Sequence, residues 1–346
     1  MDKKEKIDYA SAGVNLDAAD QALKQIKKLA KSTFNSAVLS DIGSFGGLFK
    51  PDLSGFESPV LVSSTDGVGT KLKLAFMSGI HDTVGQDIVN HCVNDILVMG
   101  ARPLFFMDYI GVGQLDPKTI EDVVAGLAKA CRENDMPLLG GEMAELPGFY
   151  NDGEYDLTGT IIGLIDQNKI IDGSSIREGD IILGLPSIGL HTNGYSLARK
   201  ICFEIAGLKF DNQIDLFRNE IGRELMKVHR SYLKPIRKLL NQLRPTGMAH
   251  ITGGGIPGNL IRIIPDNLKA VIQKDSWPVL PIFEYLQTAG DVAENDMYDA
   301  FNMGIGFMIV VRPFDAETAE SVLKAEGESV YRIGSIEKGS KAVMIT

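Results

Sequence analysis

Two stretches of the chain decide its fold: VLVSSTDGVGTK at residues 60–71 and NDILVMGARP at residues 94–103. The first opens with apolar β-formers that predict a buried strand, and it continues into a turn around Asp66 whose glycines allow close backbone approach to a ligand. Between the two stretches, residues 81–100 have the spacing of a helix. This order predicts a strand, a ligand-binding turn and a helix in an α/β or α+β domain.

The predicted helix has one polar side. At about 100° per residue its polar residues fall in one stripe, which consists of Asp87, Asn90, His91, Asn94 and Asp95. No Lys or Arg lies between Leu74 and Ala101, so no basic residue of the same helix can neutralise the two acids. A hard cation is a natural partner, because Mg²⁺ is commonly held by one or two carboxylates plus substrate phosphates. Asp66 and Asp95 would suffice; alternatively, Asp66 only forms the turn, paired with Lys71, and Asp95 is a solvated helix residue.

The rest of the chain alternates between strands and helices. Strands are predicted at residues 103–110, 156–165, 180–185, 248–252, 303–311, 330–336 and 342–346, and a turn at residues 140–145. Helices are predicted from Asn15 or Asp17 to Lys31 and at residues 116–134, 193–205, 229–243, 259–264 and 313–326. A polar, turn-rich segment at residues 166–179 is a plausible domain boundary.

Length and composition limit the function. A chain of 346 residues exceeds one typical core, which favours two domains. A hydrophobic content of 44%, no apolar run of about 18 residues and no signal-like segment predict a soluble cytoplasmic protein. The three cysteines, Cys92, Cys131 and Cys202, are far apart and are expected to be reduced. A net charge of −10 argues against a general nucleic-acid binder but not against a phosphorylated small substrate.

Five motifs occur in a fixed order. They are DGVGTK at residues 66–71, Asp95 followed by Gly100-Ala101 and Pro103, GGE at 140–142, HTNGYSL at 191–197 and HITGGG at 250–255. Together they resemble the aminoimidazole ribonucleotide synthetase (phosphoribosylformylglycinamidine cyclo-ligase) family of purine biosynthesis. The resemblance extends from YASAGVNLD at residues 9–17 to the C-terminal region, so it covers nearly the whole chain.

The resemblance implies an ATP-dependent ligase that uses Mg²⁺ and closes the ring of formylglycinamidine ribonucleotide, giving 5-aminoimidazole ribonucleotide, ADP and phosphate. It also implies a homodimer in which the N-terminal sheets of two subunits form one β-barrel, each followed by a C-terminal α/β sandwich domain. The expected domains are residues 1–168, for ATP and Mg²⁺ binding and dimerisation, and residues 169–346.

Carried over by motif, the resemblance implies a set of site residues. Nucleotide binding falls on the loop SDIGSFGGLF at residues 40–49, where Ser44 stands in place of a family glycine, on the DGVGTK turn and on the helix: Gly43, Phe45, Gly46, Gly47, Asp66, Gly67, Gly69, Thr70, Lys71, Asn94 and Asp95. Substrate binding falls on Glu142, Thr192, Asn193, Ser196, Thr252, Gly253 and Gly254. The metal ligands would be Asp66, Asp95 and Glu142, and the catalytic groups His191, His250 and Lys71.

Some interpretations remain open at this stage. Either His191 or His250 could move a proton or stabilise charge near neutral pH, whereas His81 and His229 have only a structural interpretation. The glycine-rich segment at residues 40–49 could be an ordinary loop. Related superfamily enzymes with another phosphoryl acceptor, such as thiamine-monophosphate kinase, selenophosphate synthetase and formylglycinamidine ribonucleotide synthetase, are an alternative. A nucleotide-binding regulator without turnover is another.

Overall fold

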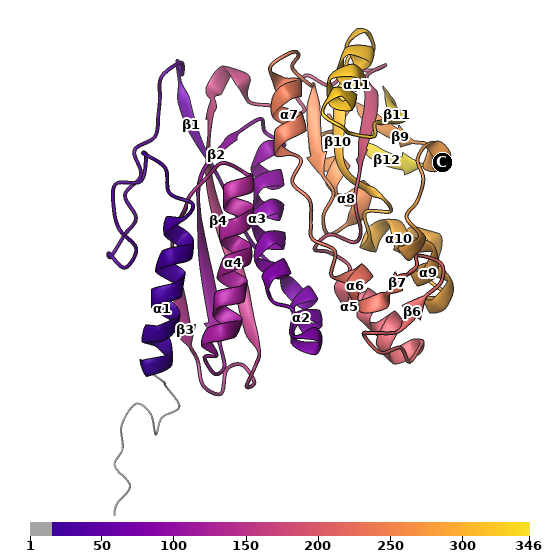
Figure 1. Ribbon diagram of the computed structural model, residues 1–346. Coiled ribbons are helices and arrows are strands. Elements are labelled where there is room, and N and C mark those ends of the chain that lie inside the picture. Colours follow the sequence, from indigo (N-terminus) through magenta and orange to yellow (C-terminus); the bar gives the residue numbers. More distant parts are fainter. Residues whose placement is uncertain (1–15) are drawn as a thin grey trace, which may run out of the picture. The chain divides into compact units, whose positions relative to one another are not determined.

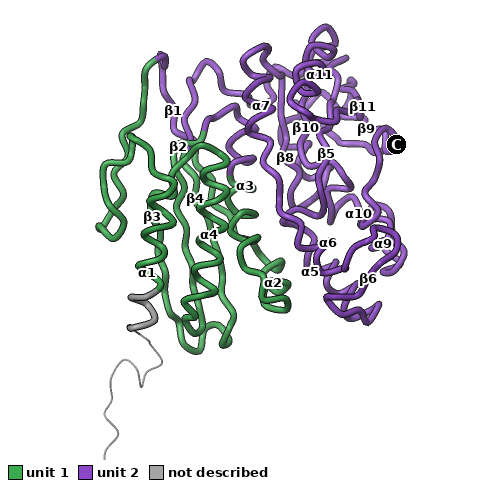
Figure 2. The backbone as a smooth tube through the Cα atoms, in the orientation of Figure 1, with its two compact units in different colours: residues 1–54, 63–92, 103–162 green, residues 55–62, 93–102, 163–346 purple. Residues whose placement is uncertain are grey.

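The computed structural model describes residues 16–346, with side chains from Ala22 onward. The chain divides into two compact units (Figure 2). Unit 1 comprises residues 1–54, 63–92 and 103–162, and unit 2 comprises residues 55–62, 93–102 and 163–346. Unit 2 therefore includes two short segments from the N-terminal half of the chain.

Unit 1 is built on a four-stranded sheet with helices on one face. The strand order is β1 (Pro59–Gly67), β4 (Tyr155–Asp166), β2 (Arg102–Val112) and β3 (Leu138–Glu145). Three long helices lie over one face of this sheet (Figure 1): α1 (Leu16–Lys31), α3 (Asp82–Leu97) and α4 (Pro117–Glu133). The turn after β1 continues as a 3₁₀ turn, Gly69–Lys71, and α2 (Leu72–Ser78). The mixed α/β class expected from the sequence is confirmed.

Local sequence accounts for these elements. In α4, Asp116 accepts a hydrogen bond of 2.9 Å from the Thr119 N–H, and Pro117 occupies the first helical position. The predicted inward face of α4 is fully buried: Ile120, Val123, Val124, Leu127, Ala128 and Cys131. Along β2 the alternation places Phe106 and Ile110 on the helix-covered face, while Tyr109 is exposed on the opposite, open face.

Unit 2 is built on a six-stranded sheet. The order is β12 (Ala342–Ile345), β9 (Leu268–Ile272), β11 (Tyr331–Lys338), β5 (Ile181–Pro186), β10 (Ile305–Val311) and β8 (Gly247–His250). The strands pair antiparallel except β12, which runs parallel to β9. All of β10 is buried, so it forms the centre of this core.

Helices and short elements complete unit 2. The helices are α5 (Tyr195–Arg199), continued by π-helical Lys200–Ile205, α6 (Ile221–Leu225), α7 (Leu233–Leu240), α8 (Gly255–Leu260), α9 (Pro281–Gly290), α10 (Glu294–Ala300) and α11 (Ala316–Ala325). A 3₁₀ turn, Gln167–Lys169, follows β4, and β6 (Gln213–Ile214) pairs with β7 (Asn219–Glu220).

Four sequence predictions need correction. The strand predicted to be buried at residues 60–62 belongs to the edge strand β1, in which Leu61 is 66% exposed. Residues 140–145 form part of strand β3, not a turn, because Gly140 and Gly141 pair in register with β2. The helix predicted at residues 229–243 begins only at Leu233, since Pro235 is tolerated only in a first turn, and residues 229–232 precede the helix. The helix predicted at residues 259–264 is α8, which begins earlier, at Gly255.

The predicted start of α1 at Asn15 lies outside the described residues, and nothing can be said of the Asp17 side chain. All three cysteines are buried free thiols, as expected. Among the described residues no helix has both the length and the apolar character that crossing a membrane requires.

Candidate functional site

The end of β1 presents a partly exposed carboxylate, that of Asp66. Asp66 Oδ2 lies 2.7 Å from Nε2 of His91 on α3, and Asp66 Oδ1 accepts a 2.7 Å hydrogen bond from the Gly67 N–H. The Asp66 side chain is 47% exposed, whereas that of His91 is 3% exposed. The buried imidazole therefore orients a half-exposed carboxylate, and hydrogen bonds of this kind also orient metal-binding carboxylates. Gly69, with φ +69°, provides the left-handed residue that the turn needs.

Lys71 lies elsewhere than expected. Its Nζ is 2.8 Å from Asp87 Oδ2, and both side chains are fully buried. Burial lowers the pKa of Lys71, and the neighbouring Asp87 opposes that shift. Lys71 is therefore an internal partner of Asp87 and does not reach out to phosphates. The cation that neutralises Asp87 therefore comes from the segment before α3, so the sequence of the helix alone does not reveal it. Lys71 pairs with Asp87 and not with Asp66 as the alternative interpretation expected.

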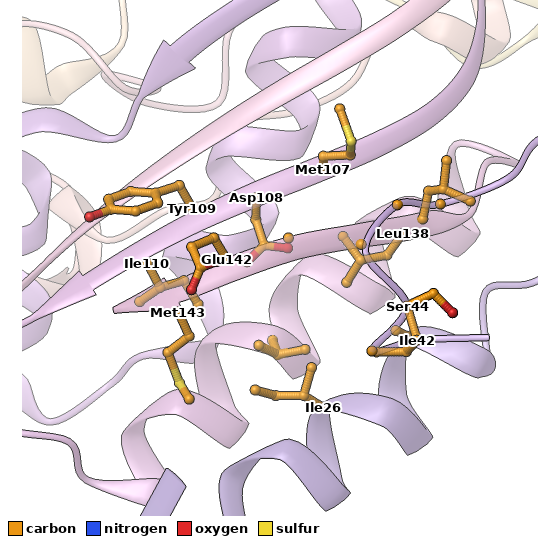
Figure 3. A pocket seen from close by; sticks show the side chains of 18 of the residues that line it. Ile26, Ile42, Ser44, Met107, Asp108, Tyr109, Ile110, Leu138, Glu142 and Met143 are labelled. Carbon is orange, nitrogen blue, oxygen red and sulfur yellow. The ribbon is translucent and has the colours of Figure 1, made fainter. Parts of the chain in front are cut away.

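The glycine-rich loop lines a cavity of about 460 Å³ in unit 1 (Figure 3). Ile26 of α1, Ile42 and Ser44 form one side of this cavity, and Asp108 and Glu142 from neighbouring strands form another. The loop residues expected to bind nucleotide all line it: Gly43, Phe45, Gly46 and Gly47. The structure therefore brings the loop together with Glu142.

Glu142 does not join Asp66. β1 and β3 are opposite edges of the sheet, with β4 and β2 between them, so about 14 Å separates the two strands. Glu142 is also paired in register with Tyr109, on the open face, whereas Asp66 contacts His91 of α3 on the covered face. Within one chain, Glu142 cannot share a metal ion with Asp66, and this part of the expected ligand set is corrected.

Asp108 is a titratable residue that the sequence analysis missed. Its carboxylate occupies space that a side chain at residue 141 would need, because a Cβ on Gly141 would lie 2.4 Å from Asp108 Oδ1. Burial raises the pKa of Asp108 to about 7. The alternation of β2 gave a usable signal, since Asp108 stands between the buried Phe106 and Ile110 on the covered face.

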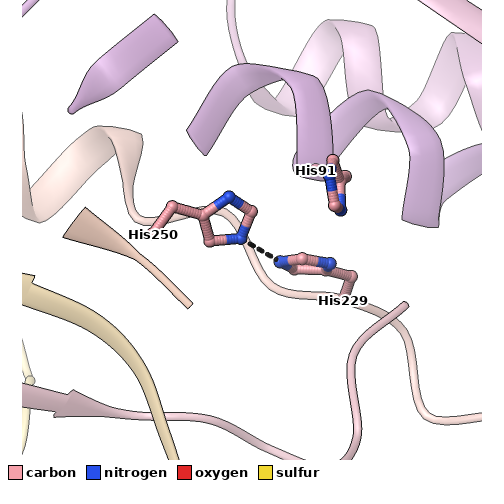
Figure 4. Close-up of side chains that lie close together, drawn as sticks. All are labelled: His91, His229 and His250. Atoms are coloured by element: carbon pink, nitrogen blue, oxygen red, sulfur yellow. Dashed lines mark hydrogen bonds between the residues drawn. The ribbon is translucent and has the colours of Figure 1, made fainter. Parts of the chain in front are cut away.

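In unit 2, four side chains form a continuous hydrogen-bonded chain. His250 Nδ1 lies 2.8 Å from Asp95 Oδ1, and His250 Nε2 lies 3.0 Å from Nε2 of His229 (Figure 4). On its other side, His229 Nδ1 lies 2.8 Å from Oγ1 of Thr192. His229 is completely buried and connects two predicted site residues, His250 and Thr192.

The orientation of the Asn94 amide predicts where the protons of these hydrogen-bonded side chains lie. Its Oδ1 accepts the Tyr232 N–H at 3.0 Å and its Nδ2 donates to the Arg230 carbonyl at 2.9 Å, so the backbone sets the orientation of the amide. The second N–H of Nδ2 is directed at His229 Nε2, at 3.2 Å. From this contact we predict that the nitrogen offers a lone pair and that His229 carries its proton on Nδ1.

The same argument extends to His250. Because His229 Nε2 is an acceptor, His250 Nε2 must donate the proton of their hydrogen bond. A second proton lies in the contact between His250 Nδ1 and Asp95, since a carboxylate is an acceptor. Both ring nitrogens of His250 are engaged, and on this argument we predict that His250 carries a proton on each of them beside the Asp95 carboxylate.

The HTNGYSL and HITGGG motifs also come together in unit 2. The His191 ring stacks on that of His229 with centroids 4.1 Å apart and planes 17° apart. A Cβ on Gly253 would lie 3.3 Å from Asn193 Oδ1, so the two loops are adjacent. Asn259 holds the glycine turn by donating to the Gly255 carbonyl at 2.7 Å. Of the predicted substrate-binding residues, Thr192 contacts the buried histidine cluster directly, and Asn193 lies beside Gly253 in the adjacent loop.

Two α/β units that carry a solvent-facing carboxylate turn, a glycine-rich loop and a buried histidine chain define a recognisable class. The family model of AIR synthase related protein, N-terminal domain, matches residues 55–165, and that of the C-terminal domain matches residues 177–346. The chain belongs to the AIR synthase-related family.

Within that class the relatives are more specific. The phosphoribosylformylglycinamidine cyclo-ligase of Alkaliphilus oremlandii is 47% identical over 340 residues, covering 98% of this chain and 100% of the relative. That of Syntrophotalea carbinolica is 49% identical, covering 99% of this chain and 97% of the relative. The chain is therefore a member of the phosphoribosylformylglycinamidine cyclo-ligase family.

Solved structures share the fold at low sequence identity. Hydrogenase maturation protein HypE in complex with ATP superimposes with a TM-score of 0.69 at 21% identity, covering 97% of this chain and 93% of that one. Thiamine-monophosphate kinase from Stenotrophomonas maltophilia gives a TM-score of 0.66 at 18% identity, covering 94% and 95%. These similarities establish the fold alone.

Proposed function

We propose that the protein closes the imidazole ring of formylglycinamidine ribonucleotide with ATP, forming 5-aminoimidazole ribonucleotide, ADP and phosphate in purine biosynthesis in the cytoplasm. The observation that carries this proposal is the identity of 47–49% to named cyclo-ligases over nearly the full length of both chains. The alternative acceptors and the regulator without turnover have no comparable support, because the relatives at this level all bear the cyclo-ligase name.

The chemistry is a phosphoryl transfer followed by ring closure. The formyl amide oxygen attacks the γ-phosphorus of ATP and ADP leaves, which converts a poor leaving group into a phosphate ester. An amidine nitrogen then adds to the former formyl carbon. The C–O bond breaks, phosphate departs with the original formyl oxygen, and proton loss from nitrogen yields the aromatic ring.

Phosphoryl transfer needs charge neutralisation, which Mg²⁺ supplies when it is bound with the nucleotide. Asp66 fits this purpose because its half-exposed carboxylate is oriented by His91. Asp95 also fits, because its side chain is 25% exposed and Oδ1 is the oxygen that contacts His250. We assign Asp66 and Asp95 as metal ligands, and we assign the loop of Gly43, Gly46 and Gly47 to the nucleotide.

We assign charge stabilisation and proton transfer to two different histidines. Both ring nitrogens of His250 are engaged, so we assign it to stabilising the negative charge that develops near the formyl oxygen. Proton transfer then falls to His191, whose ring lies against the same cluster. Thr192, which contacts His229, and the adjacent Asn193 and Gly253 are suited to hold the ribose phosphate. Lys71 has a supporting role, holding Asp87 inside unit 1.

A homodimer with a shared β-barrel remains part of the proposal. Its support is the open face of the unit 1 sheet, which carries apolar side chains without helix cover. Leu61 is 66% exposed and Tyr109 is 37% exposed, and Phe105 and Met107 are half-buried on the same face. A second copy of this sheet would bury these side chains.

The direct test follows phosphate and the diazotisable amine of the product together, with ATP, Mg²⁺ and formylglycinamidine ribonucleotide. We expect equal amounts of phosphate and amine, both abolished in Asp95→Asn and both retained in Asp211→Asn, an exposed control of the same charge change. Phosphate without amine would point to another acceptor. Neither product from the wild-type protein would contradict an enzymatic function.

A further inference from the structure

Unit 2 contains a second cavity that the proposed reaction does not use. Its volume is about 510 Å³, within the range of small-molecule sites. It is lined by the start of β2, the end of β4, the 3₁₀ turn Gln167–Lys169 and the carboxyl end of α7 with the residues that follow. None of the residues assigned to nucleotide, substrate, metal or catalysis lines it.

The cavity is strongly basic in a chain of net charge −10. Four cations line it, namely Arg102, Lys169, Arg237 and Arg244, against one acid, Asp166. Asp166 already accepts hydrogen bonds from the backbone N–H groups of Glu57 and Ser58, at 3.1 and 2.9 Å. The excess positive charge also exceeds the partial negative charge that the carboxyl end of α7 contributes.

Internal contacts hold two of the arginines in place. Arg244 donates from Nη1 to the Asn168 carbonyl at 2.8 Å and from Nη2 to the Ile170 carbonyl at 2.7 Å, which ties it to the segment after β4. The Arg102 guanidinium lies over the Phe56 ring, 5.1 Å from its centroid. Within the described part of the chain, no carboxylate lies within ion-pair distance of Lys169 or Arg237.

We propose that this cavity binds a small organic phosphate. A phosphate group is the anion that several converging Arg and Lys side chains recognise best, because it accepts charge-assisted hydrogen bonds on three oxygens. The apolar part of the lining would accommodate the organic portion: Phe56, Leu164, Ile165, Ile171, Leu240 and Leu243. Binding here adds a ligand site to the chain beyond those of the reaction.

The test is isothermal titration with two probes at low salt: AMP, which has a ring and a phosphate, and pyrophosphate, which has phosphate alone. The pocket variant is Lys169→Ala with Arg237→Ala. The matched control is Lys234→Ala with Lys238→Ala, which removes two exposed charges from the same helix α7 outside the cavity. Retained phosphate release from ATP in both double variants verifies that they are folded.

We expect AMP to bind the wild-type and control proteins and its Kd to rise at least about tenfold in the pocket variant, because two charge-assisted contacts are lost. AMP binding that stays equal in all three proteins would assign it to the nucleotide site and overturn the proposal. Absence of AMP binding up to about 1 mM would overturn it too. Pyrophosphate binding without AMP binding would contradict the proposal that the apolar lining holds the organic part of the ligand.

Discussion

Replacing His229 tests the hydrogen-bonded chain from Asp95 to Thr192 most sharply. An Asn side chain places its amide near the position of imidazole Nδ1, and a Gln side chain places its amide near Nε2. His229→Asn therefore keeps the Thr192 contact and loses the contacts to His250 and Asn94, whereas His229→Gln does the reverse. The two variants remove similar volume, so they form a matched pair.

The two variants are expected to lower kcat by different factors. In the predicted protonation state His250 donates to His229 from a charged ring, and a hydrogen bond involving a charged group contributes about 1.5–3 kcal/mol. If that contact positions His250 in the transition state, His229→Asn lowers kcat by about 10- to 150-fold. The neutral contact to Thr192 contributes about 0.5–1.5 kcal/mol, so His229→Gln lowers kcat by about two- to twelvefold.

Steady-state kcat and KM, with unfolding midpoints as a control, separate positioning from stability. A second readout is the ¹⁵N spectrum of selectively labelled histidine, since the chain has only five. We expect His229 to carry its proton on Nδ1 and His250 to carry protons on both nitrogens. Equal kcat losses in the Asn and Gln variants, or a proton on His229 Nε2, would refute the role assigned to Asn94 and His229.

Three further predictions concern the two units. Lys71→Met leaves Asp87 buried without its cation, so it should lower the free energy of unfolding by about 3–5 kcal/mol in a denaturant titration. Adding Asp87→Leu should restore much of this stability. No recovery in the double variant would contradict the buried pair. Since the pKa of Asp108 is raised to about 7, the folded state binds this proton more tightly than the unfolded state does. Stability should therefore fall by at most about 4 kcal/mol as the pH rises from about 4 to 7. Asp108→Asn should flatten this part of the stability profile, and an unchanged slope would exclude Asp108 as its source. Tyr109→Arg places a charge on the open sheet face and should convert the proposed dimer to a monomer in sedimentation, whereas Ser340→Arg, which adds the same charge at an exposed position of unit 2, should not; a dimer in both variants would rule out this face as the interface.

Elements with strong local signals were predictable. The Asp116-Pro117 start and the apolar spacing of α4 required no tertiary information. The turn predicted at the Gly-Gly-Glu segment, residues 140–142, was wrong because glycines indicate a turn locally, whereas pairing with β2 makes this segment a strand.

The site was predictable only in part. The motifs identified Asp66, Asp95, Thr192 and His250, but hydrogen-bond partners come from remote segments. His229 follows no motif and gains its role only because α3 supplies Asn94 and β8 supplies His250. Likewise, nothing local shows that Asp87 pairs with Lys71.

The most direct test of the central claim is the fate of the formyl oxygen. Formylglycinamidine ribonucleotide labelled with ¹⁸O at the formyl group is turned over with unlabelled ATP, and the phosphate is analysed by mass. The account predicts one ¹⁸O in each phosphate released, because that oxygen leaves with the phosphoryl group. Unlabelled phosphate, with the ¹⁸O released into water, would contradict phosphorylation of the formyl oxygen and with it the proposed reaction.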